Sequence, residues 1–490
     1  MNTGGAAISV LAVSFWENRT IRILLSFLVI PNLTFLILGN FIFLVRPTIN
    51  LDFLLIGCVA LFLGRIVTVV LLFGLLVLDL VQSLAPSFFF SMPTVFEALQ
   101  DIHHLGGGYV AANILFILLF TTLTIWMVVT VFWGRTHKRL KASGILLLVG
   151  FSVLALDLSF STVPSLAEFD VAKSSLVRLQ RTLSYVENAK MTEIEAHDVD
   201  SASRPFFEAL GDNRKLPKNV VLVVMESFGV FLDKKVEAIQ FESLLSKELN
   251  DRYEVQVGKV RFKGSTVPAE IRELCRVGIN GIGVDANALP VEKCLPLLMK
   301  RRGFEVFAIH GFPGTMFDRY RWYPDLGFDE SVFLADFQRI SGHSETCGSV
   351  FKGACDFQVA DWIGDLLSAP ESPRRFIYWL SLNGHGPAYN PSREQSKLSC
   401  DSEGLRFTSS KICGSVKINE LLIRSLVSVA TKGGLPKTAF VLVGDHTPTF
   451  MFSADWQKFD QENVPFIVLW PKGTNNSDRR SALPKRESRR

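Results

Sequence analysis

Charge is scarce in this sequence: Asp, Glu, Lys and Arg make up only 20% of its 490 residues, whereas 48% are hydrophobic. The mean hydropathy of +0.29 is too high for an ordinary soluble enzyme of this size, and so apolar a composition excludes a disordered or fibrous protein. Basic residues outnumber acidic ones by only 51 to 47, whereas nucleic-acid binding needs a clustered basic face. We therefore expect a membrane anchor joined to a water-soluble domain, with no nucleic-acid partner.

Several common motifs are also missing. The sequence has no P-loop and no dinucleotide fingerprint, so it gives no support to nucleotide-driven roles. It has no Cys-x-x-Cys and no Cys/His zinc spacing, which argues against a cysteine-based metal site. All of its cysteines except Cys58 follow residue 270: Cys275, Cys294, Cys347, Cys355, Cys400 and Cys413. Pairing of nearest neighbours (275–294, 347–355, 400–413) is the simplest of many arrangements, and three disulfides predict an oxidising compartment.

The long apolar runs all lie before residue 161. Ile21–Val45 and Tyr109–Trp133 are each long enough to cross a hydrocarbon core ~30 Å thick, and Gly144–Phe160 is a shorter third run. Leu51–Leu84 is either one long tilted helix or a hairpin that turns near Gly64 and Arg65. Residues 1–160 are therefore predicted to form a transmembrane anchor of four or five helices, with five preferred.

Charges around these runs predict the orientation. The basic loop of residues 135–141 should be cytoplasmic by the positive-inside rule, and the next span then places everything after Phe160 outside. Residues 161–217 form a polar connector with apolar residues at helical spacing: Leu176, Leu179, Leu183 and Val186. This stripe fits an amphipathic helix at the membrane surface, or equally a helix packed on the soluble domain. The tail, residues 475–490, is basic and is expected to be disordered.

The soluble half alternates short apolar runs with helix-like stretches, which predicts an α/β domain with a mainly parallel sheet over residues 218–474. The predicted strands are 219–225, 304–309, 375–382, 438–443 and 464–470. Ionisable side chains follow four of them: Glu226, His310, His385 and the pair Asp445-His446. Because ligands bind outside the carboxyl ends of strands in such sheets, we expect one metal site here, with histidines that support it or bind phosphate. Carboxylate and imidazole ligands favour Zn²⁺ or Mn²⁺ over Mg²⁺.

A candidate nucleophile lies on a turn before a predicted helix. Gly264 introduces Ser265 and Thr266, and the helix is expected to begin near Pro268. Backbone N–H groups at a helix N-terminus favour a bound phosphate, and a hydroxyl that binds a metal loses its proton more readily. Thr266 is therefore the candidate nucleophile; the alternative is that Ser265 or Thr266 only caps the helix.

The order of these residues resembles one enzyme family. Met225 to Gly229, Thr266 to Glu270, His310 to Asp329 and Gly444 to His446 are similar to motifs of the lipoteichoic acid synthases. Those enzymes belong to the alkaline phosphatase/sulfatase superfamily, together with glucan phosphoglycerol transferases and lipid A phosphoethanolamine transferases. The resemblance covers roughly residues 219 to 472 and the five-span anchor, and it implies a sulfatase-like α/β fold for the soluble domain.

The resemblance also implies a role for single residues. One divalent metal would be bound by Glu226, Thr266, Asp445 and His446, and Thr266 would become phospho-substituted. The phosphate, or the leaving and entering oxygens, would contact His310, Arg319 and His385. Family members move a phospho-alcohol head group from a membrane phospholipid to a glycan or lipid acceptor. The implied location is the bacterial inner membrane, crossed several times, with the catalytic domain in the periplasm.

Two head groups stay open from the sequence. Asn383–Tyr389, followed by Cys400 and Cys413, is more similar to the phosphoethanolamine transferases, although these carry a further His downstream of His446. The Glu-Ser-Phe-Gly and Thr-x-x-x-Glu elements are more similar to the phosphoglycerol type, although Phe317 stands where lipoteichoic acid synthases usually have Trp.

Two other functions compete with a transferase. One is a sulfatase-like hydrolase or phosphodiesterase that uses water as the acceptor. Sulfatases of this superfamily generally need a Cys or Ser nucleophile, and no Cys lies near Thr266. The other is a catalytically inactive, membrane-tethered binding module, against which the complete metal-ligand set argues.

Overall fold

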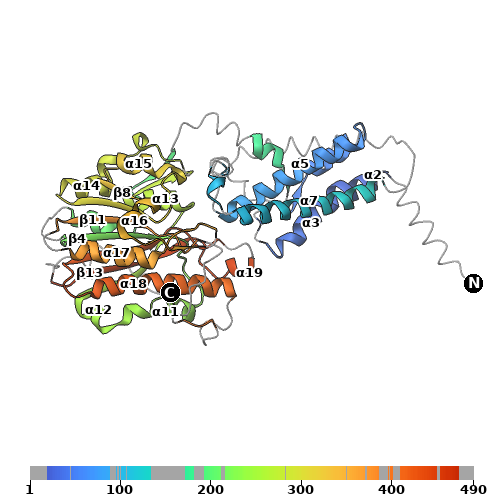
Figure 1. Cartoon of the computed structure of the whole chain (residues 1–490). Coiled ribbons are helices and arrows are strands. Elements are labelled where there is room, and N and C mark those ends of the chain that lie inside the picture. Colours follow the sequence, from blue (N-terminus) through green and yellow to red (C-terminus); the bar gives the residue numbers. More distant parts are fainter. Residues whose placement is uncertain are drawn as a thin grey trace, which may run out of the picture. The chain divides into compact units, whose positions relative to one another are not determined.

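The computed structural model describes residues 19–133 with short gaps, 172–180, 193–210, 216–385 with short gaps, 396–400 except 397, and 409–473 except 450–452. The chain divides into two compact units. The first comprises Met1–Pro93 and Gly107–Asn188, and the second comprises Thr94–Gly106 and Ala189–Arg490. Figure 1 shows helices α2, α3, α5 and α7 of the first unit in blue to teal, and the sheet of the second unit with its flanking helices in colours from green to red.

Three helices of the first unit are long and apolar enough to cross a membrane. They are Thr20–Gly39, which comprises most of α2 (Arg19–Ile23) with η1 (Leu24–Val29) and α3 (Ile30–Gly39), then α5 (Arg65–Leu84) and α7 (Gly107–Trp133). Their buried side chains form one apolar core with those of the short helix α4 (Asp52–Val59). Other large apolar side chains, such as Ile66, Leu119 and Trp126, are exposed. An exposed apolar surface of this kind is what a membrane anchor presents to lipid.

The apolar run from Leu51 to Leu84 is not one continuous helix. Helix α4 ends at Val59 and α5 begins at Arg65, so the long-helix interpretation is wrong and the break lies where the hairpin interpretation placed it. With eight residues, α4 extends only ~12 Å, which is less than the ~30 Å of a hydrocarbon core. The five-span count stays a prediction, because residues 135–141 and 144–160 lie outside the described residues.

A buried ion pair accounts for the acidic residue inside α5. Arg46 donates from Nε and Nη2 to Asp79 Oδ2, at 2.9 and 2.7 Å, and from Nη2 to Asn32 Oδ1 at 2.7 Å. A charge within an apolar helix is costly unless it is paired. Asp79 therefore contributes to the interior of this unit rather than ending the apolar helix.

The connector is described only in part. Strand β2 (Ala172–Lys173) pairs with β1 (Ile49–Asn50), and residues 175–180 are helical. Leu176 is exposed, but Leu183 and Val186 lie outside the described residues, as does the tail 475–490. The amphipathic stripe and the disordered tail therefore stay predictions.

The second unit is built on a seven-stranded sheet with the order β5-β13-β12-β4-β11-β7-β8. Its strands are β4 (Asn219–Met225), β5 (Tyr253–Arg261), β7 (Glu305–His310), β8 (Glu330–Val332), β11 (Arg375–Leu380), β12 (Thr438–Gly444) and β13 (Asn463–Pro471). The strands from β12 to β8 are parallel to one another, and β13 is antiparallel to both of its neighbours, β12 and β5. The predicted mainly parallel sheet is confirmed, with all five predicted strands in it.

The central strand β4 is apolar after Asn219 because both of its faces are covered. Every residue of β4 is buried, which is typical of parallel strands between helices. Val221, Val223 and Met225 pack into one core with α17 (Asp356–Ser368) and α18 (Ser410–Thr431). The other helices of this unit are α10 (Arg204–Ala209), α11 (Lys234–Gln240), α12 (Lys247–Arg252), α13 (Thr266–Cys275), α14 (Leu295–Arg301), α15 (Arg319–Asp325), α16 (Leu334–Ser341) and α19 (Ser453–Trp456). Polar side chains are thus left for the strand ends.

The nearest-neighbour disulfide pairing is confirmed. Disulfides join Cys275 to Cys294, Cys347 to Cys355 and Cys400 to Cys413. All three lie in the second unit, which agrees with the predicted oxidising compartment for this part of the chain.

Candidate metal centre and phosphate site

The sheet order brings the predicted site residues to one edge. Asp445 and His446 follow β12, Glu226 follows β4, His385 follows β11, and His310 ends β7. These four strands are consecutive neighbours and run parallel. Their carboxyl ends therefore meet at the same edge of the sheet, as the sequence predicted.

A tight turn after β4 connects Glu226 to its neighbours. Ser227 has a φ of 54°, in the left-handed region that is uncommon for a residue with a side chain. Its N–H donates to Asp445 Oδ1 at 2.8 Å, and its hydroxyl donates to Glu226 Oε1 at 3.0 Å. Such backbone strain clusters at functional sites, and here it holds two buried carboxylates beside each other.

His446 turns one ring nitrogen toward these carboxylates. Its Nδ1 lies 2.9 Å from the carbonyl oxygen of Thr447, which can only accept, so Nδ1 carries the proton. Its Nε2 lies 3.3 Å from Asp445 Oδ2 and 3.5 Å from Glu226 Oε1. Histidines that bind metals are commonly oriented by a backbone carbonyl in this way.

The electrostatics show that the site lacks positive charge. Burial, and then the Glu226 carboxylate, raise the pKa of Asp445 to about 7. Burial alone would lower the pKa of His446, but Asp445 and Glu226 outweigh it and raise that pKa. Two carboxylates beside a single imidazole therefore favour bound protons or a cation at neutral pH.

Thr266 begins α13 and places its hydroxyl among these groups. Its Oγ1 donates to Asp445 Oδ2 at 3.0 Å and lies 3.3 Å from Glu226 Oε2. Ser265, at the N-cap position, makes no side-chain capping hydrogen bond, and the helix begins at Thr266 rather than near Pro268. The hydroxyl of Thr266 therefore serves the site, not the helix cap. We call Glu226, Thr266, Asp445 and His446 the strand-end cluster.

The strand-end cluster has the donor chemistry of a metal centre. One ligand atom from each of Glu226, Asp445 and His446 lies within 4.8 Å of the other two, and all three side chains are buried. Two carboxylates, one imidazole and a nearby hydroxyl oxygen suit one small divalent cation. The residues present therefore fit a single divalent ion.

His310 is held as a neutral imidazole. Its Nδ1 lies 3.1 Å from the carbonyl oxygen of Leu380 and so carries the proton. Burial first, and the positive charge of Arg319 second, lower the pKa of His310 to about 3. At neutral pH the ring is uncharged, and its Nε2 is a hydrogen-bond acceptor.

Aromatic rings connect His310 with His385. The ring centroid of Phe312 lies 6.3 Å from His310 and 5.6 Å from Phe351, and Phe351 lies 4.1 Å from His385. His104, in η3 (Ile102–His104), packs its ring 5.8 Å from Phe312. Sequence reasoning missed His104, because nothing in the sequence connects residue 104 with residue 312.

Arg319 forms an ion pair with a second buried acid, Glu270. Its Nε and Nη2 donate to Glu270 Oε1 at 2.9 and 2.7 Å. The hydroxyls of Tyr323 and Tyr378 donate to Glu270 Oε2 at 2.6 and 2.9 Å. We call these four residues the Glu270 cluster. Direct contact of Arg319 with phosphate stays a prediction, because the contact that the structure shows is with Glu270.

Residues on α13 connect the two clusters. Glu270 lies four residues after Thr266, hence one helical turn further along the same face. Arg272 donates from Nη2 to the carbonyl oxygen of Gly444 at 2.8 Å, which ties α13 to the residue before Asp445. The Thr-x-x-x-Glu spacing was the only sequence signal for Glu270, and none pointed to Arg272.

Comparison with known proteins gives one family assignment. Residues 218–486, more than half of the chain, match the sequence model of the Sulfatase family. No curated protein sequence matches the chain significantly.

The chain is also similar to several solved structures, all at low identity. The lipoteichoic acid synthase LtaP from Listeria monocytogenes is 13% identical, with a TM-score of 0.37, over 55% of this chain and 72% of that one. The Streptococcus pyogenes phosphoglycerol transferase GacH, in complex with sn-glycerol-1-phosphate, is 15% identical, with a TM-score of 0.37, over 58% and 79%. The periplasmic domain of EcEptC from Escherichia coli, in complex with Zn, is 14% identical, with a TM-score of 0.36, over 58% and 76%. At these values the likeness alone assigns no activity to this chain.

Proposed function

The chain belongs to the sulfatase family, and on that premise we propose that it is a membrane-anchored, metal-dependent transferase of phospho-alcohol head groups. It would take phosphoethanolamine or phosphoglycerol from a membrane phospholipid and pass it to a glycan or lipid of the cell envelope. One observation carries this proposal: the hydroxyl of Thr266, at a helix N-terminus, lies 3.0 and 3.3 Å from the two carboxylates of a candidate metal centre. A buried hydroxyl in that position suits a nucleophile attacking phosphorus.

The strand-end cluster would hold the metal. Glu226, Asp445 and His446 would bind one divalent ion, together with the Thr266 oxygen, and the nitrogen ligand favours Zn²⁺ or Mn²⁺. When bound, the ion supplies positive charge that offsets the charge of the phosphoryl oxygens and makes the threonine hydroxyl more acidic.

The first half of the proposed reaction loads Thr266. Its Oγ1 forms a bond to phosphorus while the bond from phosphorus to the diacylglycerol oxygen breaks. The hydroxyl proton leaves through the hydrogen bond to Asp445 Oδ2 and is passed on to the departing oxygen, which is released as diacylglycerol. The threonine is left carrying the phospho-alcohol, with protons and charge balanced.

The second half transfers this group to the acceptor. An acceptor hydroxyl attacks phosphorus, the bond to Thr266 Oγ1 breaks, and the proton that the acceptor hydroxyl gives up returns to the threonine oxygen. Neutral His310, with Nε2 as an acceptor, is suited to take the proton of the incoming hydroxyl. His385, at the adjacent strand end, is the proposed partner for the other phosphoryl oxygens.

The anchor and the disulfides support the proposed location. Three helices are long and apolar enough to cross a membrane, and three disulfides lie in the unit that carries the site. We propose a bacterial inner-membrane protein whose catalytic domain faces the periplasm, where a phospholipid donor and an envelope acceptor are both available.

Head-group release from defined lipids tests the proposal. The detergent-solubilised full chain, loaded with Zn²⁺ or Mn²⁺, is incubated with labelled phosphatidylglycerol or phosphatidylethanolamine, and diacylglycerol is followed by chromatography. We expect diacylglycerol from one of the two lipids, lost in Thr266→Ala and retained in Ser265→Ala, which serves as the matched hydroxyl control.

The other outcomes separate the alternatives. Release of free phospho-alcohol with no acceptor product would indicate the hydrolase. No diacylglycerol from either lipid, with metal bound, would contradict a lipid donor of this kind. No diacylglycerol and no bound metal would favour the inactive binding module.

A further inference from the structure

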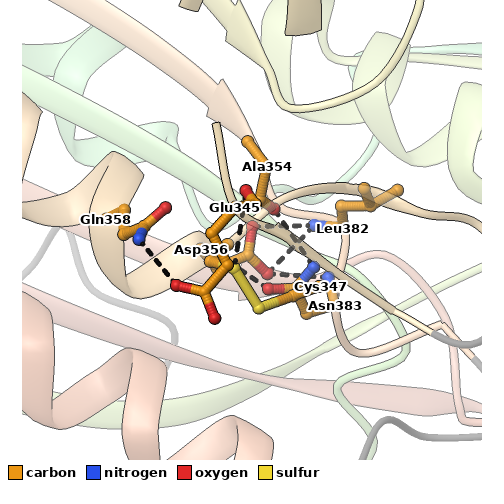
Figure 2. The surroundings of a disulfide bond; sticks show 8 residues. Glu345, Cys347, Ala354, Asp356, Gln358, Leu382 and Asn383 are labelled. Atoms are coloured by element: carbon orange, nitrogen blue, oxygen red, sulfur yellow. Dashed lines mark hydrogen bonds between the residues drawn. A yellow bond between two sulfur atoms is a disulfide. The ribbon is translucent and has the colours of Figure 1, made fainter. Parts of the chain in front are cut away.

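A disulfide-closed segment lies beside the loop that carries His385. Strands β9 (Thr346–Cys347) and β10 (Gly353–Ala354) pair antiparallel, and the disulfide Cys347–Cys355 closes the segment. Asp356 follows directly, as the first residue of α17. Figure 2 shows Asp356 next to this disulfide, with the backbone of Leu382 and Asn383 turned toward its carboxylate.

Asp356 holds this loop through backbone hydrogen bonds. The N–H of Leu382 donates to both carboxylate oxygens at 3.1 Å, and the N–H of Asn383 donates to Oδ2 at 2.7 Å. In return, the N–H of Asp356 donates to Asn383 Oδ1 at 2.7 Å, and Asn383 Nδ2 donates to the carbonyl oxygen of Ala354 at 3.2 Å. Asp356 is only 4% exposed. The carboxylate therefore fixes the backbone of the loop (Figure 2).

The loop in turn lies against Glu226. Ser381 is still held by the sheet, through its N–H to the carbonyl oxygen of Val224 at 2.9 Å, and its hydroxyl accepts from the N–H of Glu226 at 2.9 Å. Gly384 packs so closely that a Cβ there would lie 2.0 Å from the Glu226 carbonyl oxygen. Strand β11 ends at Leu380, and Asp356 accepts from the backbone N–H groups of Leu382 and Asn383 on the path to His385.

The same segment also supports the loop after His310. The N–H of Ala354 donates to the carbonyl oxygen of Gly311 at 2.8 Å, and a Cβ on Gly353 would lie 2.1 Å from that oxygen. Residues 353–356 therefore contact the loop that carries His385 and the loop that follows His310.

We propose that Asp356, held by the Cys347–Cys355 segment, is a positioning residue that fixes the loop carrying His385, and with it the loop after His310, relative to Glu226. Its effect on turnover rests on the proposed transferase function, whereas its effect on loop geometry does not. Glu226 and Asp445 directly follow strands held on both sides by their neighbours, and His310 is itself the last residue of such a strand. Loss of Asp356 should therefore displace His385 and spare the metal. The separation of phosphate handling from metal binding distinguishes this role from general stability.

Two variants and one control test it. Asp356→Asn keeps the shape of the side chain but turns an N–H₂ group toward donors. Cys347→Ser/Cys355→Ser opens the segment and gives a second variant if the first fails to fold. Cys400→Ser/Cys413→Ser is the matched control, because the two disulfides close stretches of similar sequence separation, 8 and 13, and should cost similar stability. Each metal-loaded full-length protein is assayed for kcat and KM, metal content, Tm, hydrogen exchange of residues 381–385 and affinity for inorganic phosphate.

The expected result is a fall in kcat of at least ~10-fold for both variants, since a small displacement of catalytic groups has this effect. KM should change much less, metal content should stay the same, and exchange at residues 381–385 should be faster. The control should lose Tm but keep kcat. The proposal would be overturned if kcat and the exchange rate of residues 381–385 in Asp356→Asn equalled those of the wild type. A loss of kcat in the control as large as in the two variants would also overturn it.

The assay also separates this proposal from the transferase function. If the wild-type protein releases no diacylglycerol, the transferase proposal fails. The positioning role of Asp356 is then tested by the affinity for inorganic phosphate and by hydrogen exchange alone. Phosphate binding that is at least ~10-fold weaker in Asp356→Asn, with unchanged metal content, would support the positioning role. Equal phosphate affinity and equal exchange would refute it.

Discussion

Helix α13 joins two buried acidic clusters of opposite design. Its first residue, Thr266, belongs to the strand-end cluster, in which two carboxylates lie beside a single imidazole. One turn later, Glu270 accepts hydrogen bonds from two N–H groups of a guanidinium and from two tyrosine hydroxyls. The Glu270 cluster is complete in charge and hydrogen bonds, whereas the strand-end cluster is short of positive charge.

The difference indicates what each cluster is for. A buried acid that is fully paired costs little to keep and stabilises one conformation. A buried pair of carboxylates with too little positive charge is costly, and burial and the Glu226 charge raise the pKa of Asp445 to about 7. Functional sites keep such costly arrangements because a ligand compensates them. We therefore interpret the Glu270 cluster as support for the helix and the strand-end cluster as the place of chemistry.

Removal of the proposed nucleophile should have the largest effect. Thr266→Ala should lower the rate of head-group release by at least ~10³-fold, since the attacking oxygen is lost while both carboxylates and His446 remain. Metal content and Tm should change little, which atomic emission and calorimetry can measure. Wild-type turnover in this variant would refute a covalent route through Thr266.

Neutralising Glu270 should destabilise the Glu270 cluster. Glu270→Gln should destabilise the protein by about 3 to 5 kcal/mol, because it leaves the buried Arg319 unpaired. Denaturant unfolding of the second unit measures this loss. A change below ~1 kcal/mol would mean that the pairing stabilises the fold much less than its geometry indicates.

An acid-to-amide change in the strand-end cluster should instead stabilise the metal-free protein. Asp445→Asn keeps an oxygen for the N–H groups of Ser227 and His446 but removes the repulsion with Glu226. The metal-free variant should therefore have a Tm higher by about 2 to 4 °C, the shift that ~1 kcal/mol gives in a large domain. A lower Tm than metal-free wild type would contradict a site under electrostatic strain.

The metal-free protein should lose stability as the pH rises. The folded pKa of Asp445, about 7, lies above its unfolded value of ~4, so the folded state holds a proton that the unfolded state releases. The stability from that proton is present at low pH and is lost between about pH 4 and 7, and the raised pKa of His446 acts in the same direction at higher pH.

Bound metal replaces these protons. The gain in Tm on adding Zn²⁺ should therefore grow from about pH 5 to pH 8, as scanning calorimetry can measure. In Asp445→Asn the pH dependence of the metal-free protein should be flatter. A metal-induced gain that is independent of pH in wild type would contradict the ligand assignment.

How much the sequence predicted depended on how local each signal was. Strand β4 was predictable because it is an unbroken apolar run, and Glu226 because it follows directly. Strand β5 was missed because it lies at the edge of the sheet and buries only Tyr253 and Val260 of its nine residues, and β8 because it has only three residues. Strand-end residues were predictable because sheet geometry alone brings them together.

Long-range partners were not predictable in this way. The partners of Glu270 are distant in the sequence: Arg319 is separated from it by 49 residues and Tyr378 by 108. No local sequence pattern connects them. The motif predicts a phosphate contact for Arg319, which stays a prediction, but it gave no sign of the ion pair with Glu270 that the structure shows. Asp356 was missed for the same reason, since its partners are backbone N–H groups 26 and 27 residues away.

Metal stoichiometry tests the central claim most directly. Metal-free wild type, Asp445→Asn and Glu270→Gln are titrated with Zn²⁺ by calorimetry, and bound metal is counted by atomic emission at a temperature where all three are folded. The account predicts one tightly bound ion in wild type and in Glu270→Gln, and an affinity at least ~100-fold weaker in Asp445→Asn. No bound ion in wild type, or equal binding in Asp445→Asn, would contradict it.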